Sequence, residues 1–358
     1  MQIGDRIARR MKLHDLRILM AVAQAGSMNK AAVFLNMTQS AVSRSIAELE
    51  RTVGVSLLDR TARGVEPTEY GRAMLECGVA VFDDLRQGAK KIEFLTDPAA
   101  GEVRIGCHPG LAASFVPAVV DGVARRYPRI AFHLVVAEVG TLHRELTERN
   151  VDLLITREFG PLADERLSFE FLFDDSFVVV AGAQNPWVRR RRIVLSELLN
   201  EAWALPPPET VFGSVVMEAF RSCGLEYPRT TVVTIPPDVR MSLLATGHFL
   251  TIFAPSALRF PIRRPELKVL PVELPMAHVP SGIVTLKNRT LSPVAQLFVD
   301  GARNVAKPLA KRKRWTRCRV MAPTHCSRQR NMMPAIEVET DGRRTWPAQP
   351  CLTRSRPR

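Results

Sequence analysis

The chain has 358 residues, of which 50 are Lys or Arg and 36 are Asp or Glu, so its formal net charge is +14 and its length suits two or three domains. It contains no run of about 18 uncharged apolar residues, and its first residues lack the apolar segment of a secretory signal, so we expect no membrane segment and a cytoplasmic location. Its six cysteines are scattered without CxxC or Cys/His spacing, which argues against a disulfide framework and a zinc site; we expect no metal and no cofactor.

Residues 31–60 predict two short helices joined by a tight turn. Thr38 is placed to cap the second helix, because its hydroxyl can accept a hydrogen bond from a free amide of the first turn. Apolar residues recur at helical spacing on the inner face of that helix, and its outer face is small and polar, as a helix that enters the major groove requires. The inner face has Val42, Ile46, Leu49 and Val53, and the outer face has Gln39, Ser40, Ser43, Arg44 and Ala47.

A small hairpin is predicted after the second helix, which Gly54 ends. Residues 57–61 and 65–67 form its strands, and Arg60 and Arg63 lie at its tip, where they could contact DNA phosphates. A helix–turn–helix pattern alone also occurs in helical bundles that bind no DNA.

Residues 11–68 resemble the winged helix–turn–helix of LysR-type transcriptional regulators, and the resemblance extends in order and length to about residue 306. One departure is Leu58, which stands where the family usually has an aromatic residue. The matching residues are Leu16-Arg17, Gly26-Ser27, Ala31-Ala32, Thr38-Gln39-Ser40-Ala41-Val42-Ser43-Arg44, Leu49-Glu50, Gly54-Val55, Arg60, Pro67-Thr68 and Gly71.

The resemblance implies an α/β multi-domain protein with an N-terminal winged helix–turn–helix (residues 11–68), a linker and dimerisation helix (68–96), and a two-lobed α/β effector domain of periplasmic-binding-protein type (101–306). It implies a regulator that binds double-stranded DNA as a homodimer or homotetramer, responds to a small-molecule effector and has RNA polymerase as a candidate partner. The expected DNA contacts are Ser27, Asn29, Lys30, Thr38, Gln39, Ser40, Ser43, Arg44, Arg60 and Arg63.

A long helix is predicted from about residue 68 to 95. Its apolar residues alternate at spacings of three and four, which favours pairing with a second helix. The alternative is a single helix that packs on its own domain. The apolar positions are Leu75, Gly78, Phe82, Leu85, Ala89 and Ile92.

Beyond Gly101 strands and helices alternate, which predicts open, mostly parallel sheets in two halves. The expected strands are 102–107, 130–139, 151–156, 177–181, 230–235, 249–253 and 281–287, and the expected helices lie within 109–127, 141–150, 212–223, 238–245 and 292–305.

Ligands of such folds bind where strands end and helices begin. We therefore expect the effector near His108, Gly110 and Leu111, whose helix would offer free amides to an anion. For Arg157, beside Thr156, the sequence leaves three interpretations: a ligand contact, a solvated side chain, or an ion-pair partner of Glu158. The alternative for His108 is a surface loop histidine without a ligand. Cys107 is predicted to be a buried residue at the end of a strand. The predicted effector contacts are His108, Gly110, Leu111, Thr156, Thr210 and Gly247, with Thr251 as a further wall residue.

No catalytic residues are expected, because the seven histidines are scattered and no GxSxG, HExxH or GxxxxGK motif occurs. The alternative function is a solute-binding protein of the same α/β fold, which would lack the first 95 residues. The segment 311–358 is predicted to be disordered. Residues 308–358 carry a net charge of +10, so they could add non-specific DNA affinity; we favour no evolved role for them.

Overall fold

A computed structural model describes residues 3–61, 64–158, 160–258, 265–275 and 279–310. The expectations for Arg63 and for the segment 311–358 lie outside the described residues, and so does the side chain of Arg60. Among the helices that are described, none is long and apolar enough to cross a membrane.

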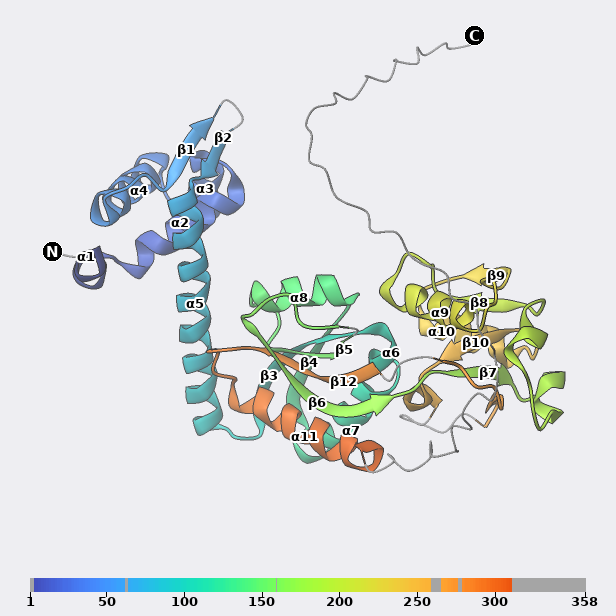
Figure 1. Ribbon diagram of the computed structural model, residues 1–358. Helices are drawn as coiled ribbons and strands as arrows, with labels where there is room; N and C mark the ends of the chain where they lie inside the picture. Colours follow the sequence, from blue (N-terminus) through green and yellow to red (C-terminus); the bar gives the residue numbers. More distant parts are fainter. Residues whose placement is uncertain (1–2, 62–63, 159, 259–264, 276–278, 311–358) are drawn as a thin grey trace, which may run out of the picture. The chain divides into compact units, whose positions relative to one another are not determined.

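The N-terminal part is a winged helix–turn–helix, as the sequence predicts (Figure 1). The Thr38 hydroxyl accepts a hydrogen bond from the Ala41 amide at 3.2 Å and begins the recognition helix. Gly54, at φ 89°, ends the helix in the left-handed region that favours glycine. An additional short helix, which the sequence analysis did not find, precedes the motif. The elements are α1 (Ile3–Arg10), α2 (Leu13–Ala25), α3 (Met28–Phe34), α4 (Gln39–Val53), β1 (Leu58–Thr61) and β2 (Gly64–Pro67).

The core of this domain is the predicted inner face of α4. Its four apolar side chains, Val42, Ile46, Leu49 and Val53, are at most 5% exposed, and they pack with side chains of α2 such as Leu16 and Leu19. Burying such side chains stabilises the fold by roughly 1.5–3 kcal/mol each. The core therefore fixes which face of α4 remains outside.

Helix α5 (Glu69–Thr96) begins at Thr68, whose hydroxyl accepts a hydrogen bond from the Gly71 amide at 3.0 Å. Its predicted apolar face divides in two. Leu75, Gly78 and Phe82 pack against the helix–turn–helix core, which is the alternative that the spacing left open. By contrast, Leu85 and Ile92 are 52% and 67% exposed.

Two five-stranded sheets follow, each with helices on both faces (Figure 1). The first has the order β4-β3-β5-β12-β6 and the second β11-β7-β10-β8-β9. In each sheet one strand, β12 or β7, runs against the other four. The strands are β3 (Ala100–Cys107), β4 (Arg129–Val136), β5 (Leu153–Arg157), β6 (Leu167–Asp175), β7 (Val178–Gly182), β8 (Trp203–Leu205), β9 (Thr230–Val233), β10 (Leu250–Phe253), β11 (Leu267–Val269) and β12 (Val279–Leu286).

The helices cover the sheets because successive strand residues point to opposite faces. In β5, Ile155 faces the core under α7 and α11, whereas Leu154 faces the core under α8. Helices α9 and α10 cover the second sheet in the same way. The helices are α6 (Pro109–Ala112), α7 (Phe115–Arg126), α8 (Val139–Thr147), α9 (Val211–Ser222), α10 (Pro237–Ala245) and α11 (Pro293–Ala310), with 3-10 turns at Pro186–Arg189, Leu195–Leu198 and Pro255–Leu258.

A buried ion network joins α5 to the first sheet. The carboxylate of Asp83, which is fully buried, accepts hydrogen bonds from Arg289 at 2.7 and 2.9 Å and from Arg149 at 2.8 Å. Arg289 also donates to the Val151 carbonyl at 2.6 Å and to the Asp152 carboxylate at 3.2 Å. Arg86 donates to the same carboxylate at 2.9 Å, so three cations surround one carboxylate, as a buried charge requires.

Burial by itself raises the pKa of Asp83, but the hydrogen bonds from Arg289 and Arg149 outweigh it and lower the pKa from 3.8 to about 2. A carboxyl with a lowered pKa stabilises the fold above its unfolded pKa. This stabilisation is therefore complete above about pH 4 and decreases as the pH falls towards 2.

We predict that Asp83→Asn lowers the free energy of unfolding in urea at pH 7 by about 3–5 kcal/mol, because it leaves the buried Arg289 without its main counter-charge. Asp84→Asn is the matched control, since Asp84 is 64% exposed and lies 3.6 Å from Arg149. The difference between the two variants should shrink between pH 4 and pH 2. Equal stability of both variants at pH 7 would show that the network contributes nothing net.

Candidate functional site

The outer face of α4 presents a polar surface. Gln39, Ser40 and Arg44 are exposed, and Ser43 is half-buried. No acidic residue lies in the first turn of α3 or α4, so the partial positive charge at each helix start faces no carboxylate there. Such a surface can approach phosphates and hydrogen-bond base edges.

The other predicted DNA contacts lie at helix starts or on the hairpin. Ser27 caps α3 by accepting from the Lys30 amide at 3.5 Å, and the next residues of that turn, Asn29 and Lys30, are exposed. Thr38 uses its hydroxyl both as a cap and in a 3.1 Å hydrogen bond with Ser40. The position of Arg60 is in β1.

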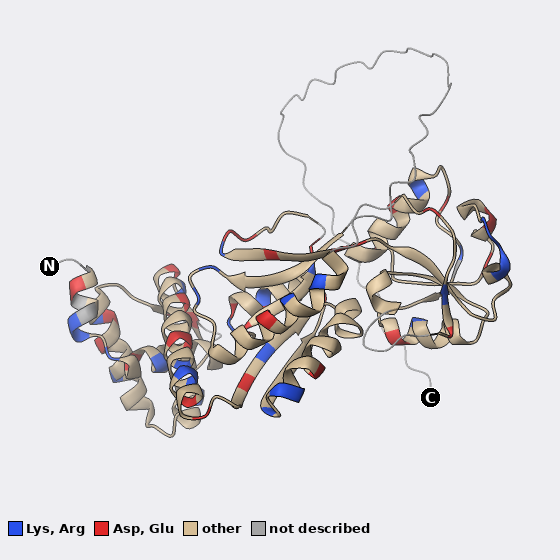
Figure 2. Cartoon of the chain, turned by 90° about the horizontal axis from the view of Figure 1, so that it is seen from below, with Lys and Arg blue, Asp and Glu red and all other residues tan. Residues whose placement is uncertain are grey.

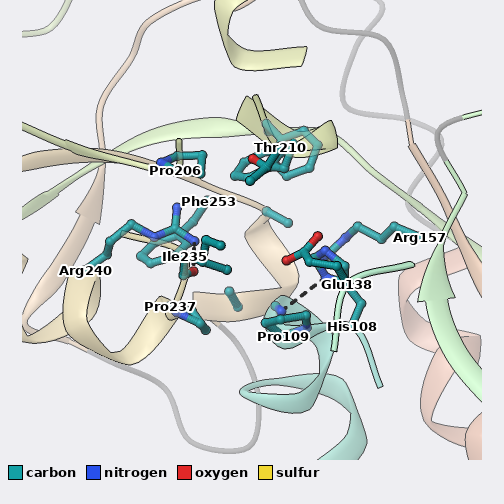
Figure 3. Close-up of a pocket in the computed structure, with 15 residues that line it drawn as sticks. His108, Pro109, Glu138, Arg157, Pro206, Thr210, Ile235, Pro237, Arg240 and Phe253 are labelled. Carbon is teal, nitrogen blue, oxygen red and sulfur yellow. Dashed lines mark hydrogen bonds between the residues drawn. The ribbon is translucent and has the colours of Figure 1, made fainter. Parts of the chain in front are cut away.

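A second site is a cavity in the effector domain, lined from both α/β lobes (Figure 3). His108, Gly110, Glu138 and Arg157 come from the lobe of the first sheet. Arg240 comes from α10 in the other lobe, and in Figure 3 the two arginines enter from opposite sides. Apolar groups form much of the remaining wall, namely Phe177, Pro206, Phe212, Ile235, Pro237, Phe253, Ala254 and Ala257.

The loop after β3 is held by its own histidine. Nδ1 of His108 accepts a hydrogen bond from the Gly110 amide at 3.3 Å, so the ring proton of the neutral imidazole lies on Nε2. Burial, and then the charges of Arg157 and Arg240, lower the pKa of His108 to about 3. His108 is therefore uncharged near neutral pH.

The expected free amides of this loop are not free. The amides of Leu111 and Ala112 both donate to the His108 carbonyl at 2.9 Å, and the Gly110 amide donates to the His108 ring. An anion bound here must therefore be held by side chains, and the prediction of an amide cradle is wrong. The sequence could not show that the His108 ring accepts the hydrogen bond from the Gly110 amide that was expected to bind an anion.

Arg157 at the end of β5 is buried and paired with an acidic residue that the sequence analysis did not consider. Its Nη2 donates to the Asp175 carboxylate at 3.1 Å and to the Ser256 hydroxyl at 3.2 Å. Glu158, the sequence neighbour, instead lies 3.2 Å from His143. A β-carbon at Gly110 would lie 2.6 Å from Nη1 of Arg157, so glycine gives the guanidinium its space beside the cavity.

Arg240 is the second buried cation, at 5% exposure. It donates to the backbone carbonyls of Ile252 and Ile235 at 3.3 and 3.4 Å, and its buried Nε has no hydrogen-bond partner in the part of the chain that the structure describes. Its guanidinium carbon lies 4.7 Å from the centre of the Phe253 ring and 5.8 Å from that of Phe212. Within the described residues, no carboxylate forms an ion pair with it.

Burial, and then repulsion from Arg157, lower the pKa of Arg240 to about 10, so it remains charged at neutral pH. Burial also raises the pKa of the cavity residue Glu138. Cys107, beneath the loop, is fully buried, and burial raises the pKa of its thiol to about 12. That thiol is therefore unreactive, as expected for a buried strand-end cysteine.

Three predicted effector contacts are not among the residues that line the cavity. Leu111 is part of the core under α7, and Thr156 is buried within β5. Gly247, at φ 79°, follows α10 and packs against Gln184. His108, Gly110 and Thr210 do line the cavity, and Thr251 is buried with its hydroxyl bonded to the Ala204 carbonyl.

Comparison with known proteins matches both regions. Residues 13–72 fit the bacterial regulatory helix-turn-helix protein model of the lysR family, and residues 96–307 fit the LysR substrate binding domain. The chain belongs to the LysR family of transcriptional regulators. It is a sequence-specific DNA-binding regulator with a small-molecule effector domain, and the helix–turn–helix match counts against the alternative of a solute-binding protein.

Similar regulators are alike over nearly their whole length. The HTH-type transcriptional regulator GbpR of Azospirillum brasilense is 25% identical over 82% of this chain and 86% of its own length. The transcriptional dual regulator GltC of Bacillus subtilis is 26% identical over 81% and 96%. A full-length OxyR variant from Pseudomonas aeruginosa shares the fold, with a TM-score of 0.59, 21% identity, and coverage of 84% of this chain and 98% of that one.

Sequence reasoning missed Arg240, Glu138 and the phenylalanines of this LysR-type cavity. A signal for Arg240 was present: it shares a helical stripe with Pro237, Met241 and Leu244, all of which are buried. A charged residue on the buried stripe of a short helix needs a compensating partner or a function. Glu138 and Phe253 gave no such signal.

Proposed function

We propose that this regulator reads DNA through α4, that its effector is a small anion with an apolar body, and that it catalyses no reaction. Buried Arg240 is the observation that carries the effector proposal. We place the protein in the cytoplasm because a bacterial regulator must reach its DNA, and we propose RNA polymerase as the partner that it influences there.

Direct reading of bases is assigned to the outer face of α4. Gln39, Ser40, Ser43 and Arg44 are the donors and acceptors on this face, and Ser27, Asn29, Lys30, Thr38, Arg60 and Arg63 are assigned to nearby phosphates. Arg44 is the one long cation among the four, and guanidinium bonds two acceptors of guanine or of a phosphate in one plane. It is therefore the most informative residue to remove.

We predict that Arg44→Ala weakens binding to a DNA site selected from a random pool by about 1–3 kcal/mol and relaxes preference at one base pair. Arg51→Ala is the control, because Arg51 lies in the last turn of the same helix. Gel-shift titrations of both variants give the comparison. If Arg44→Ala bound the selected site with unchanged affinity, the assignment of α4 as the helix that reads the bases would be wrong.

The effector proposal rests on charge and on the wall of the cavity. Arg157 already has Asp175 as its counter-charge, whereas the partners of Arg240 among the described residues are backbone carbonyls and the faces of Phe253 and Phe212. A carboxylate or similar anion would supply the missing counter-charge. The apolar wall fits an apolar or aromatic body, and the neutral His108 can donate a further hydrogen bond from Nε2.

We predict that some aromatic or alkyl carboxylates in a thermal-shift panel stabilise the protein, by about 2.7 kcal/mol at a concentration of 100 Kd, and that their neutral amides do not. Arg240→Met should remove this shift and still fold, since it leaves no buried carboxylate unpaired. Arg157→Met should lower the free energy of unfolding by about 3–5 kcal/mol, because it leaves the buried Asp175 carboxylate without its counter-charge. Arg221→Met, an exposed control, should keep the shift. The proposal is contradicted if carboxylates raise the melting temperature of Arg240→Met as much as that of the wild type. It is also contradicted if only neutral compounds bind.

Pairing of two chains is assigned to the second half of α5. Leu85, Ile92 and Leu95 are 52%, 67% and 74% exposed, an unusual amount of apolar surface for one helix. We propose that a second copy covers them and that this contact builds a homodimer or homotetramer, which places two reading helices on one DNA site.

We predict that Leu85→Glu dissociates the chains, because the pairing would bury an unpaired carboxylate. Analytical ultracentrifugation measures the mass. Leu75→Glu is not a suitable control, since Leu75 packs on the helix–turn–helix core; Glu93→Gln, an exposed change on the same helix, should leave the assembly intact. A Leu85→Glu variant of unchanged mass would show that other surfaces hold the chains together.

A further inference from the structure

The lobe of the second sheet carries four consecutive arginines, Arg189, Arg190, Arg191 and Arg192, here called the arginine loop. All four are exposed, and Figure 2 shows them as one unbroken blue stretch. Within the described part of the chain, no carboxylate forms an ion pair with any of them. Like charges so close together repel one another, so the loop raises the free energy of the free protein unless an anion binds it.

The loop is held in place at both ends. Before it, the buried Asn185 side chain accepts from the Trp187 amide and donates to the Gly247 carbonyl, both at 3.0 Å. After it, Ile193 and Leu195 are buried in the core of the second sheet. The cations are therefore presented from a fixed support, so that binding a partner costs little ordering of the backbone.

Among the described residues, the acidic residues that follow form no ion pair with the arginine loop. Glu197 uses one carboxylate oxygen to accept from the Val194 amide at 2.8 Å, and Glu201 is the next acid along the chain. Arg190 lies over the Trp187 ring at 5.8 Å, which orients one guanidinium. With extended backbone at Arg190, the four positions span roughly 10 Å.

We propose that the arginine loop binds the phosphate backbone of duplex DNA outside the segment read by the helix–turn–helix. Duplex DNA carries one negative charge per roughly 1.7 Å of axis, a density that an acidic protein surface rarely matches. The same chain is bound to DNA through α4, so flanking duplex is present at high effective concentration. The loop then adds affinity and salt dependence without adding sequence preference.

The test compares two lengths of duplex that carry one site selected by the full-length protein from a random pool: about 30 base pairs and about 90 base pairs. The loop variant has all four arginines changed to Gln. The matched control changes four other exposed arginines, Arg125, Arg126, Arg221 and Arg229, to Gln. All proteins keep the C-terminal cations, so that their contribution cancels, and thermal melts verify folding.

We expect the gain in affinity from the short to the long duplex at 100 mM salt to be at least tenfold larger for the wild type and the control than for the loop variant. The slope of log affinity against log salt on the long duplex should fall by about 0.9 for each phosphate that the variant no longer neutralises. A second variant with the four arginines changed to Lys should restore most of the slope.

Equal behaviour of the loop variant and the wild type on the long duplex overturns the proposal. If that variant binds DNA normally but loses activation in transcription with purified RNA polymerase, the loop contacts an acidic protein surface, and the DNA proposal is wrong. Failure of the wild type to bind the short duplex would instead contradict the assignment of α4 as the reading helix, so the two failures are distinguishable.

Discussion

The burial of the Asp83 carboxylate by Arg289 and Arg149 is the constraint on which the organisation of this regulator depends. The network ties α5, which carries the DNA-binding domain, to the turns at one end of the first sheet. Three strands leave this end for the cavity. The Asp152 carboxylate accepts from the Arg104 amide of β3 at 2.9 Å, β5 runs from Leu153 to Arg157, and β12 ends just before Arg289. The contact with the linker helix and the cavity therefore lie at opposite ends of the same strands.

The two buried arginines of the cavity illustrate the difference between a structural and a functional charge. Arg157 has Asp175 and Ser256 as partners, so its removal would leave a buried carboxylate uncompensated. Arg240 has no such partner within the described residues, although the Nε atoms of both arginines are buried there without a hydrogen-bond partner. A protein retains a buried charge of this kind at a stability cost, and the cost is offset when a ligand brings the opposite charge.

The fold was predictable from the sequence where buried apolar residues recur at the regular spacing of a helix or a strand. The inner face of α4 and the capping Thr38 follow from local spacing, and both are as predicted. Strands β6, β8 and β11 were missed, since two of them have only three residues and β6 (LSFEFLFDD) mixes charged and apolar residues at the sheet edge. The extra helix α1 is short and was likewise missed.

The cavity was only partly predictable, because its residues come from loops and helices far apart in the chain. His108, Gly110 and Thr210 follow strands or precede helices, which is the rule that located them. Arg240 and Glu138 meet these residues only after the two lobes have folded. The partner of Arg157 could not be deduced either, since Asp175 lies 18 residues away on a strand that the pattern did not reveal.

We propose that an anion in the cavity and DNA on α4 influence each other's binding. The most direct measurement is the affinity for the selected DNA site with and without a saturating carboxylate identified by thermal shift, together with the affinity for that carboxylate with and without DNA. Both affinities should change by the same factor, on the order of 5–150, because coupling between two sites is reciprocal, and this factor should fall to one in Arg240→Met. A carboxylate that stabilises the wild type yet leaves its DNA affinity unchanged would contradict the account.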